Sequence, residues 1–211
     1  MIKVVIVDDH ALIRQSIGMM LESIGDIAVV GEAASGETAL ELSNEMKPDV
    51  VLMDVRMPGI GGLEATRQIL ELDIGARVIG LPGYNDRAYP GLFMNAGASG
   101  YITKDAGLEE IQTAIRRVYE GHTYLCEPIA RQLDITENDQ LDNPFKRLTE
   151  RELQVALLFA ESYRFEEITQ LLNLSERSIR SYRSRILDKL GIASDVDLAK
   201  LAIRFSMIEP E

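Results

Sequence analysis

Residues 49–62 read DVVLMDVRMPGIGG, and this stretch sets the architecture of the chain. Its apolar run, 50–53, has the residue types of a strand that is buried on both faces. Asp54 follows the run at once, and then come a Met-Pro-Gly turn and two more glycines. A strand that ends in an acid and a tight turn is typical of a parallel sheet with a ligand site beyond its strand ends.

The pattern around this strand repeats along the first 120 residues. Similar apolar runs lie at 4–7, 27–30, 78–81 and 100–103. Stretches with helical periodicity lie at about 11–23, 36–46, 62–72, 86–96 and 107–120. Alternating strands and helices predict a parallel sheet with helices on both faces. We therefore expect a doubly wound α/β domain with five strands over residues 1–120. For its sheet we take the flavodoxin-like order 2-1-3-4-5, which is one of the two common orders of such folds.

The rest of the chain follows a different pattern. Residues 121–147 break the alternation, and 134–144 (DITENDQLDNP) are polar and acidic, which predicts a linker. From residue 148 to 211 the periodicity is helical only, and we expect a separate all-α domain. Thr149 and Glu152 have the spacing of a capping box at its start. Helices are expected at about 165–172, 176–190 and 194–206.

Composition is typical of a soluble two-domain protein. Of the 211 residues, 46% are hydrophobic, yet no apolar run reaches the ~18 residues that a membrane span needs. A single cysteine, Cys126, excludes an internal disulfide and suits the reducing cytoplasm. The net charge of -12 argues against binding nucleic acid over the whole surface, so any such contact requires a local basic region.

Acidic residues are predicted to converge at one edge of the sheet. Asp8 and Asp9 follow the first strand, Asp54 ends the third, and Lys104 follows the fifth. The first and third strands are neighbours in the expected order, so their carboxyl ends flank the crevice where such folds bind ligands. Three carboxylates repel one another unless a cation lies between them, and Mg²⁺ prefers such oxygens. We expect Asp8, Asp9 and Asp54 to be metal ligands.

These groups are also suited to phosphoryl chemistry. Asp54 can act as a nucleophile toward an activated phosphoryl group, giving an acyl phosphate, while the metal and Lys104 offset negative charge. The glycine-rich turn behind Asp54 lets the backbone approach the phosphoryl group. His10 is expected near the metal without binding it, and His122 receives no role.

Three segments of the predicted α/β domain resemble the receiver domain of bacterial response regulators, a CheY-like fold: VVIVDDH, DVVLMDVRMPGIGG and GASGYITK. The resemblance implies that Asp54 is the phosphoacceptor and that Lys104 senses the phosphoryl group. It implies a metal site at Asp8 and Asp9. It also makes Tyr101 an aromatic switch residue.

One position departs from the receiver pattern. The family normally has Thr or Ser at the end of strand four, where its hydroxyl follows the phosphoryl oxygen, whereas VIGLPGY places Pro82 there. Proline has neither a hydroxyl nor a backbone N–H. We therefore hypothesise that Pro82 impairs switching while leaving the chemistry at Asp54 intact. A regulator that works without phosphorylation is the alternative that this residue keeps open.

The stretch 175–190 is locally basic in the otherwise acidic second domain. Its apolar side carries Ile179 and Ile186, and Ser175 and Gly191 suit its two ends. Arginine forks suit guanine edges and phosphates, and serines near a helix start can bind phosphate. The polar face carries Arg177, Arg180, Ser181, Arg183 and Ser184.

The segment 146–207 resembles the helix-turn-helix of LuxR/NarL (FixJ) regulators. The resemblance makes 176–190 the recognition helix, with Arg180, Ser181 and Ser184 facing bases and with Arg177 and Arg183 on phosphates. It implies dimerisation through the last helix and an inverted-repeat site with half-sites about one DNA turn apart.

Four motifs resemble the GacA/UvrY/LetA group most closely: GIGGLEAT, LTERELQ, SYRSRILDKLGI and DVDLAKLAIR. This resemblance implies a hybrid sensor kinase upstream. It also implies target promoters of small regulatory RNAs that titrate a CsrA-type translational regulator.

The main rival from another class is an aspartate-nucleophile phosphatase. Such enzymes need D-x-D after the first strand, with the nucleophile there, whereas Asp8 and Asp9 are adjacent and the best nucleophile is Asp54. We expect no enzyme beyond self-catalysed phosphoryl transfer and dephosphorylation at Asp54. A turnover assay with a generic phosphate ester separates these alternatives.

Overall fold

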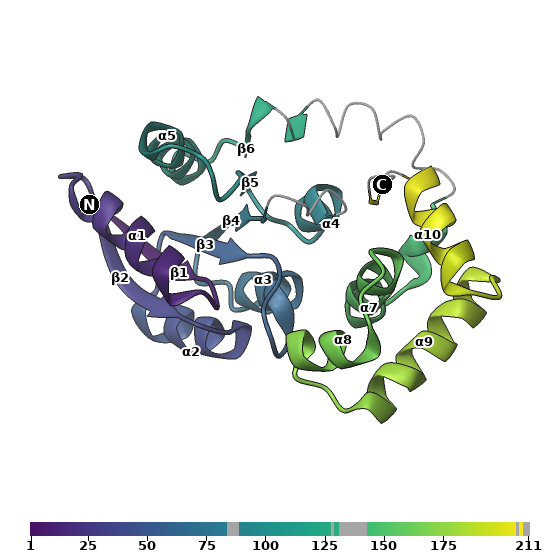
Figure 1. Ribbon diagram of the computed structural model, residues 1–211. Coiled ribbons are helices and arrows are strands. Elements are labelled where there is room, and N and C mark those ends of the chain that lie inside the picture. The colour runs from purple at the N-terminus through teal and green to yellow at the C-terminus, as the bar shows by residue number, and fades with distance from the viewer. Residues whose placement is uncertain (84–88, 128, 131–142, 206, 209–211) are drawn as a thin grey trace. The chain divides into compact units, whose positions relative to one another are not determined.

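The computed structural model describes residues 1–83, 89–127, 129–130, 143–205 and 207–208, and its contacts divide the chain into two compact units, Met1–Leu133 and Asp134–Glu211. The first unit alternates strands and helices (Figure 1). Its strands are β1 Ile2–Val7, β2 Ile27–Ala33, β3 Val50–Asp54, β4 Arg77–Leu81, β5 Gly100–Tyr101 and β6 Tyr124–Leu125. Its helices are α1 Ala11–Glu22, α2 Gly36–Met46, α3 Gly61–Glu71, α4 Tyr89–Asn95 and α5 Leu108–Tyr119.

All strand pairs in the sheet are parallel, and the order is β2-β1-β3-β4-β5-β6. The predicted order of the first five strands is confirmed, but the predicted number is wrong because β6 extends the sheet. β6 has only two residues and pairs with β5 through Gly100–Tyr124 and Tyr101–Leu125. A two-residue strand has no periodicity to detect, and β6 lies in the segment that the sequence assigned to the linker.

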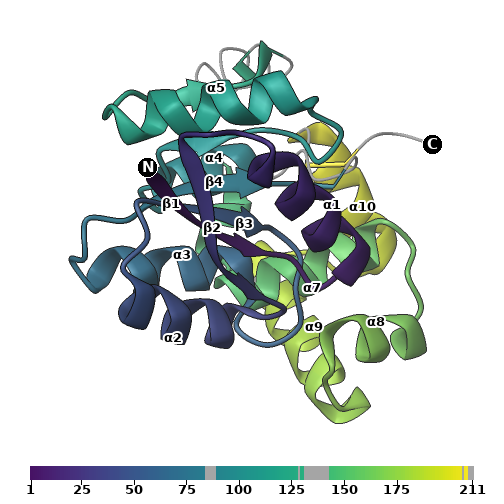
Figure 2. The same cartoon turned by 90° about the vertical axis from the view of Figure 1, so that its left-hand side faces the viewer.

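Helices cover both faces of the sheet. Helices α1 and α5 contact one another, while α3 contacts both α2 and α4. In Figure 2 the strands lie between α5 on one side and α2 and α3 on the other. β3 is the central strand and is buried at all five positions, as its continuous apolar run predicts. The carboxyl ends of β1 and β3 are adjacent because Val7 pairs with Met53.

The second unit is helical among its described residues. It consists of η2 Pro144–Arg147, α7 Glu150–Ala160, α8 Phe165–Leu172, α9 Glu176–Leu190 and α10 Asp195–Arg204. The Thr149 capping box, the Ser175 cap and the left-handed Gly191 at the end of α9 are all confirmed. Helix α7 contacts both α9 and α10, and α8 contacts α9.

Glu152 joins α7 to α9. Its side chain is buried and accepts from the Thr149 backbone N–H at 2.8 Å and from Lys189 Nζ at 2.6 Å. Burial raises the pKa of Glu152, but the bonds from Lys189 and Thr149 outweigh it and hold the pKa below its ordinary value of 4.5. The capping residue that the sequence predicted is therefore also an ion-pair partner within the core of this unit.

Some expectations concern residues whose structure is not described. Most of the predicted linker piece 134–144 and the start of the predicted helix 86–96 lie outside the described residues. Among the helices that are described, none has both the length and the apolar character for crossing a bilayer.

Candidate functional site

The acidic site lies at the carboxyl ends of β1 and β3. Asp8 directly follows β1, and its backbone N–H donates to the Ala33 carbonyl oxygen at 3.1 Å. Asp54 is the last residue of β3. Asp8 and Asp54 are 0% and 1% exposed, which is rare for aspartates and requires compensating partners.

Lys104 supplies part of that compensation. Its Nζ lies 2.7 Å from Asp8 Oδ2 and 2.7 Å from Asp54 Oδ2. Its backbone N–H donates to the Pro82 carbonyl oxygen at 3.2 Å, which ties the segment that follows β5 to the residue directly after β4. The predicted convergence of Asp8, Asp54 and Lys104 therefore appears as direct contact between their charged groups.

The buried position makes Asp54 unusually basic. Burial raises the pKa of Asp54 to about 7, Lys104 opposes that rise, and the Asp8 charge adds to it. Burial also lowers the pKa of Lys104, but the two carboxylates outweigh it and raise that pKa above its ordinary value. Because one ammonium faces several carboxylates, the site favours a further cation.

The side chains fit a divalent metal ion. One ligand atom from each of Asp8, Asp9, His10 and Asp54 lies within 4.8 Å of the others. Carboxylate oxygens dominate this set, which suits a hard cation such as Mg²⁺. His10 lies beside the acidic residues: its Nδ1 is 2.8 Å from Asp9 Oδ1 and 3.2 Å from Asp8 Oδ1.

The turn after Asp54 brings backbone close to the site. The Gly62 N–H donates to the Val55 carbonyl oxygen at 3.3 Å. A Cβ at Gly62 would lie 1.9 Å from the Asp54 carbonyl oxygen, so only glycine permits this approach. The Arg56 backbone N–H points to Asp54 Oδ1 at 3.4 Å. The glycine-rich turn thus packs against the backbone of the candidate nucleophile.

The two predicted switch positions are Pro82, directly after β4, and Tyr101, in β5. Pro82 is buried, and residues 84–88 lie outside the described residues. Tyr101 is fully buried, and its ring meets Phe93 edge to face with centroids 5.7 Å apart. A Cβ at Gly80 would lie 2.5 Å from the Tyr101 ring, so the absence of a side chain at position 80 makes room for this ring.

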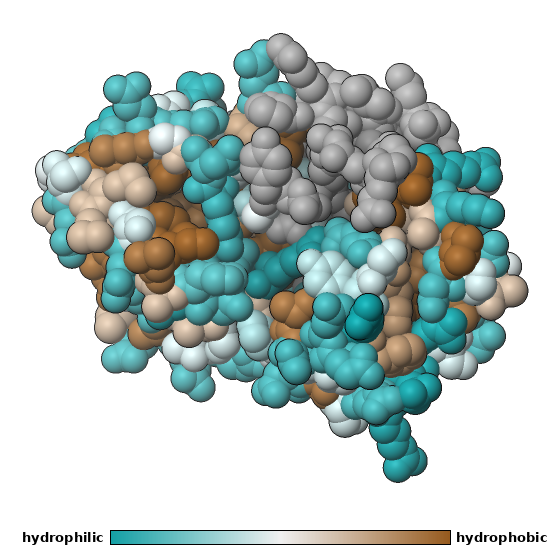
Figure 3. All heavy atoms as spheres, viewed as in Figure 1, coloured by the Kyte–Doolittle hydropathy of each residue, from teal (hydrophilic) through white to brown (hydrophobic). Residues whose placement is uncertain are grey.

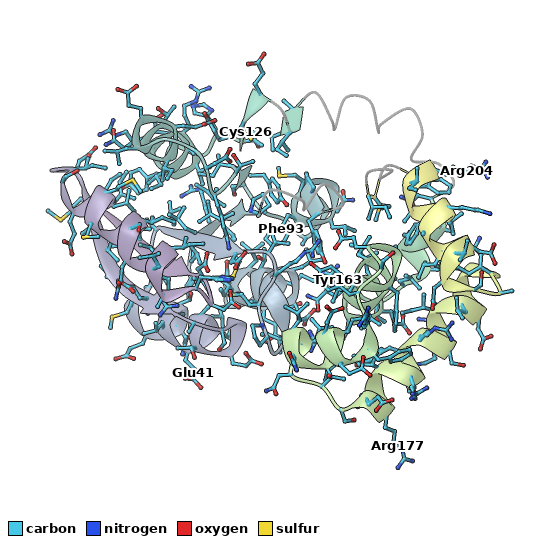
Figure 4. All side chains as sticks on the ribbon, in the orientation of Figure 1. Glu41, Phe93, Cys126, Tyr163, Arg177 and Arg204 are labelled. Atoms are coloured by element: carbon cyan, nitrogen blue, oxygen red, sulfur yellow. The ribbon has the colours of Figure 1, made fainter. Side chains whose placement is uncertain are left out.

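The candidate DNA-binding face lies on α9. Arg177 projects from the N-terminal part of α9 (Figure 4), where hydrophilic residues cover the surface (Figure 3). Ser181 and Ser184 are exposed, and the Arg180 side chain is 64% exposed. These four predicted contact residues therefore share an accessible helix.

Arg183 differs from the other arginines of this helix. Its Nε donates to both carboxylate oxygens of Asp195, at 2.8 and 3.1 Å, and its guanidinium lies 6.0 Å from the Phe159 ring centroid. The side chain is 33% exposed. The Asp195 partner was missed in the sequence because it lies beyond a turn, on α10, and no local spacing indicates it. The phosphate contact of Arg183 stays a prediction.

Two protein families match this chain. Residues 4–116 match the family described as response regulator receiver domain. Residues 146–202 match the family described as bacterial regulatory proteins, luxR family. The first match contains Asp8, Asp9, Asp54 and Lys104, and the second contains all of α9.

Full-length relatives carry both parts. The chain is 48% identical over 211 residues to response regulator GacA of Pseudomonas aeruginosa, with 99% of each chain covered. It is 44% identical over 213 residues to response regulator UvrY of Escherichia coli K12, covering 100% of this chain and 98% of the relative. Among solved structures it is similar to RcsB of Salmonella enterica serovar Typhimurium bound to promoter rprA in the presence of phosphomimetic BeF3-. That likeness has a TM-score of 0.64 at 25% identity and covers 95% of this chain and 97% of RcsB.

Proposed function

This chain belongs to the bacterial response regulators with a luxR-type DNA-binding domain, and we propose that it transmits a phosphoryl signal from Asp54 to DNA bound by α9. The observation that carries the proposal is the burial of Asp54 beside Asp8, with Lys104 Nζ 2.7 Å from both carboxylates. The matches to the two families do not favour the alternative, which is a regulator that works without phosphorylation.

The proposed chemistry is transfer of one phosphoryl group to the Asp54 carboxylate. An Asp54 oxygen forms a bond to phosphorus as the bond from phosphorus to the donor breaks, and the donor leaves with the electron pair of that bond. Lys104 contacts the same carboxylate and is placed to pair with a phosphoryl oxygen. Attack of water on the phosphorus of the acyl phosphate releases inorganic phosphate and restores the Asp54 carboxylate. We propose that the chain catalyses only this transfer and dephosphorylation at its own Asp54.

Asp8, Asp9 and Asp54 are the proposed Mg²⁺ ligands, with His10 beside them. When bound, Mg²⁺ would offset the negative charge of the transferring phosphoryl group. The protein's own part is to hold the Asp54 carboxylate in place: β3 fixes its backbone, and Lys104 fixes one oxygen.

The proposed partners follow from the family and the motifs. A sensor histidine kinase, of the hybrid type, supplies the phosphoryl group in the cytoplasm. The phosphorylated chain dimerises through α10 and binds an inverted-repeat promoter site, with α9 in the major groove. The proposed target genes encode small regulatory RNAs. Arg180, Ser181 and Ser184 face bases, and Arg177 and Arg183 contact phosphates.

Acetyl phosphate with Mg²⁺ tests the proposal on the full chain. We expect intact-mass spectrometry to detect one added phosphoryl group on the wild type and none on the Asp54→Ala variant. Asp105→Asn removes an exposed carboxylate outside the site and serves as the matched control, so it should be labelled like the wild type. Labelling of the Asp54→Ala variant to the same extent would refute Asp54 as the phosphoacceptor.

The consequence for DNA binding is measured on the same samples. We expect the labelled wild type to shift toward dimer in sedimentation and to retain DNA from a library of random duplexes more strongly than unlabelled protein. Release of phosphate from a generic ester at a sustained rate would favour the phosphatase alternative instead.

A further inference from the structure

Arg180 lies on the exposed face of α9, and two neighbouring side chains contact it. Its Nε and Nη2 donate to one oxygen of Glu176, Oε1, at 3.0 and 2.5 Å. Its guanidinium carbon lies 4.8 Å from the centroid of the Phe165 ring, which belongs to the first residue of α8. An ion pair and an aromatic face therefore restrain the same guanidinium from two different helices.

This restraint contributes little to folding. The side chains of Arg180 and Glu176 are 64% and 56% exposed, and ion pairs so accessible to water add little to stability. Their effect is on orientation, because a free arginine side chain samples many rotamers and loses them when it binds. A guanidinium that is oriented before binding loses less conformational entropy when it binds.

The contacts also determine which edge of Arg180 stays available. Glu176 occupies the edge formed by Nε and Nη2. The end of the fork, formed by Nη1 and the second N–H of Nη2, points away from that carboxylate. A planar pair of donors at this end matches the O6 and N7 acceptors that guanine presents in the major groove.

We propose that Glu176 and Phe165 are positioning residues that orient Arg180 toward one guanine in each half-site. The inference rests on the proposed DNA-binding function of α9 and adds the residues that set its specificity. Arg183 does not share this role, because both oxygens of Asp195 already hold its guanidinium and only 33% of its side chain is exposed.

A second role for Glu176 has to be separated from this one. An acid at the start of a recognition helix repels DNA phosphates, so its removal raises affinity for every sequence alike. Positioning affects discrimination between bases, whereas repulsion affects overall affinity. The preference for guanine at one position, measured as a ratio of dissociation constants, distinguishes the two.

The probe is a library of randomised DNA duplexes, from which the full-length protein, treated with acetyl phosphate and Mg²⁺, selects its site. The wild-type site and its three substitutions at each position are then titrated with five proteins at one salt concentration. The variants are Arg180→Ala, Glu176→Gln, Phe165→Leu and the control Glu166→Gln. The control removes an equal charge from an exposed acid next to Phe165 in the first turn of α8.

We expect Arg180→Ala to lower the guanine preference at one position of the half-site by about tenfold or more. Glu176→Gln and Phe165→Leu should each lower it at that same position by about threefold to tenfold, since they free the guanidinium. Glu166→Gln should leave every base preference unchanged.

Three results would overturn the inference. A Glu176→Gln protein that binds all duplexes more tightly but keeps its guanine preference has lost only repulsion. An Arg180→Ala protein with unaltered preferences means that Arg180 reads no base. If the wild type selects no sequence at all, the proposed function itself fails, which separates that failure from the other two.

Discussion

Replacing Gly80 with alanine tests how the buried Tyr101 ring is accommodated. A Cβ at position 80 would lie 2.5 Å from Tyr101 Cδ2, 2.7 Å from its Cε2 and 3.0 Å from Phe93 Cδ1. To restore ordinary contact the Tyr101 ring has to retreat by about 1 Å, and Phe93 stands against it at an edge-to-face centroid distance of 5.7 Å. The backbone of β4 cannot move away from the ring, because β4 pairs with both β3 and β5.

Two opposing effects set the magnitude. Overpacking a filled core costs about 1–3 kcal/mol. Removing a glycine from a strand interior returns about 0.5–1 kcal/mol of backbone entropy. From the middle of each range, we expect Gly80→Ala to lower the free energy of unfolding of the first unit by about 1 kcal/mol.

Urea unfolding of the full chain measures this, with the transitions of the two units fitted separately. Gly25→Ala is the matched control, because a Cβ at Gly25 meets nothing within 4 Å, and its stability should equal or slightly exceed that of the wild type. A double-mutant cycle with Tyr101→Ala then isolates the clash. If Gly80→Ala costs as much without the tyrosine ring as with it, the steric argument is refuted.

Three further predictions concern the switch position, the turn and the helical unit. Pro82→Thr should increase the gain in dimerisation that phosphorylation causes, and an unchanged gain in sedimentation contradicts the idea that Pro82 impairs switching. Gly62→Ala should slow labelling by acetyl phosphate about a hundredfold, because its Cβ collides with the Asp54 carbonyl oxygen and misplaces the carboxylate. Mass spectrometry over time checks this, and wild-type labelling rates would count against it. Lys189→Met should destabilise the helical unit by about 1–2 kcal/mol at neutral pH, because Glu152 loses its partner. The pKa of Glu152 is lowered on folding, so its stabilisation is present above its ordinary value of 4.5 and is lost as the pH falls through the folded value. Urea unfolding should therefore show a smaller loss of stability with acid in Lys189→Met than in the wild type, and equal acid losses would disprove the pairing.

The sequence alone determined features that depend on neighbouring residues. The burial of β3 was predictable from the four consecutive apolar residues 50–53, and the position of Asp54 directly after them needs no further information. Thr149 and Glu152 predicted the start of α7, because a capping box is a contact within one turn. The convergence of Asp8 with Asp54 was also predictable, because the first and third strands are neighbours in the flavodoxin-like order that we took for the sheet.

Tertiary structure alone decided the contacts between residues far apart along the chain. No local pattern indicated that Arg183 would pair with Asp195 on the next helix, or that Lys189 would reach Glu152. The two-residue strand β6 also exists only through its pairing with β5. Such contacts depend on how helices and strands pack, whereas periodicity reports only which face of each element is apolar.

The same division applies within the acidic site. The residue types at the strand ends, taken together with the flavodoxin-like strand order, indicated which groups meet there. Burial, however, is a property of the packed domain. Only the fold buries the Asp54 carboxyl and raises its pKa to about 7, and only the fold places the Lys104 ammonium 2.7 Å from two carboxylates. Desolvation depends on every side chain that excludes water, and those come from all parts of the chain.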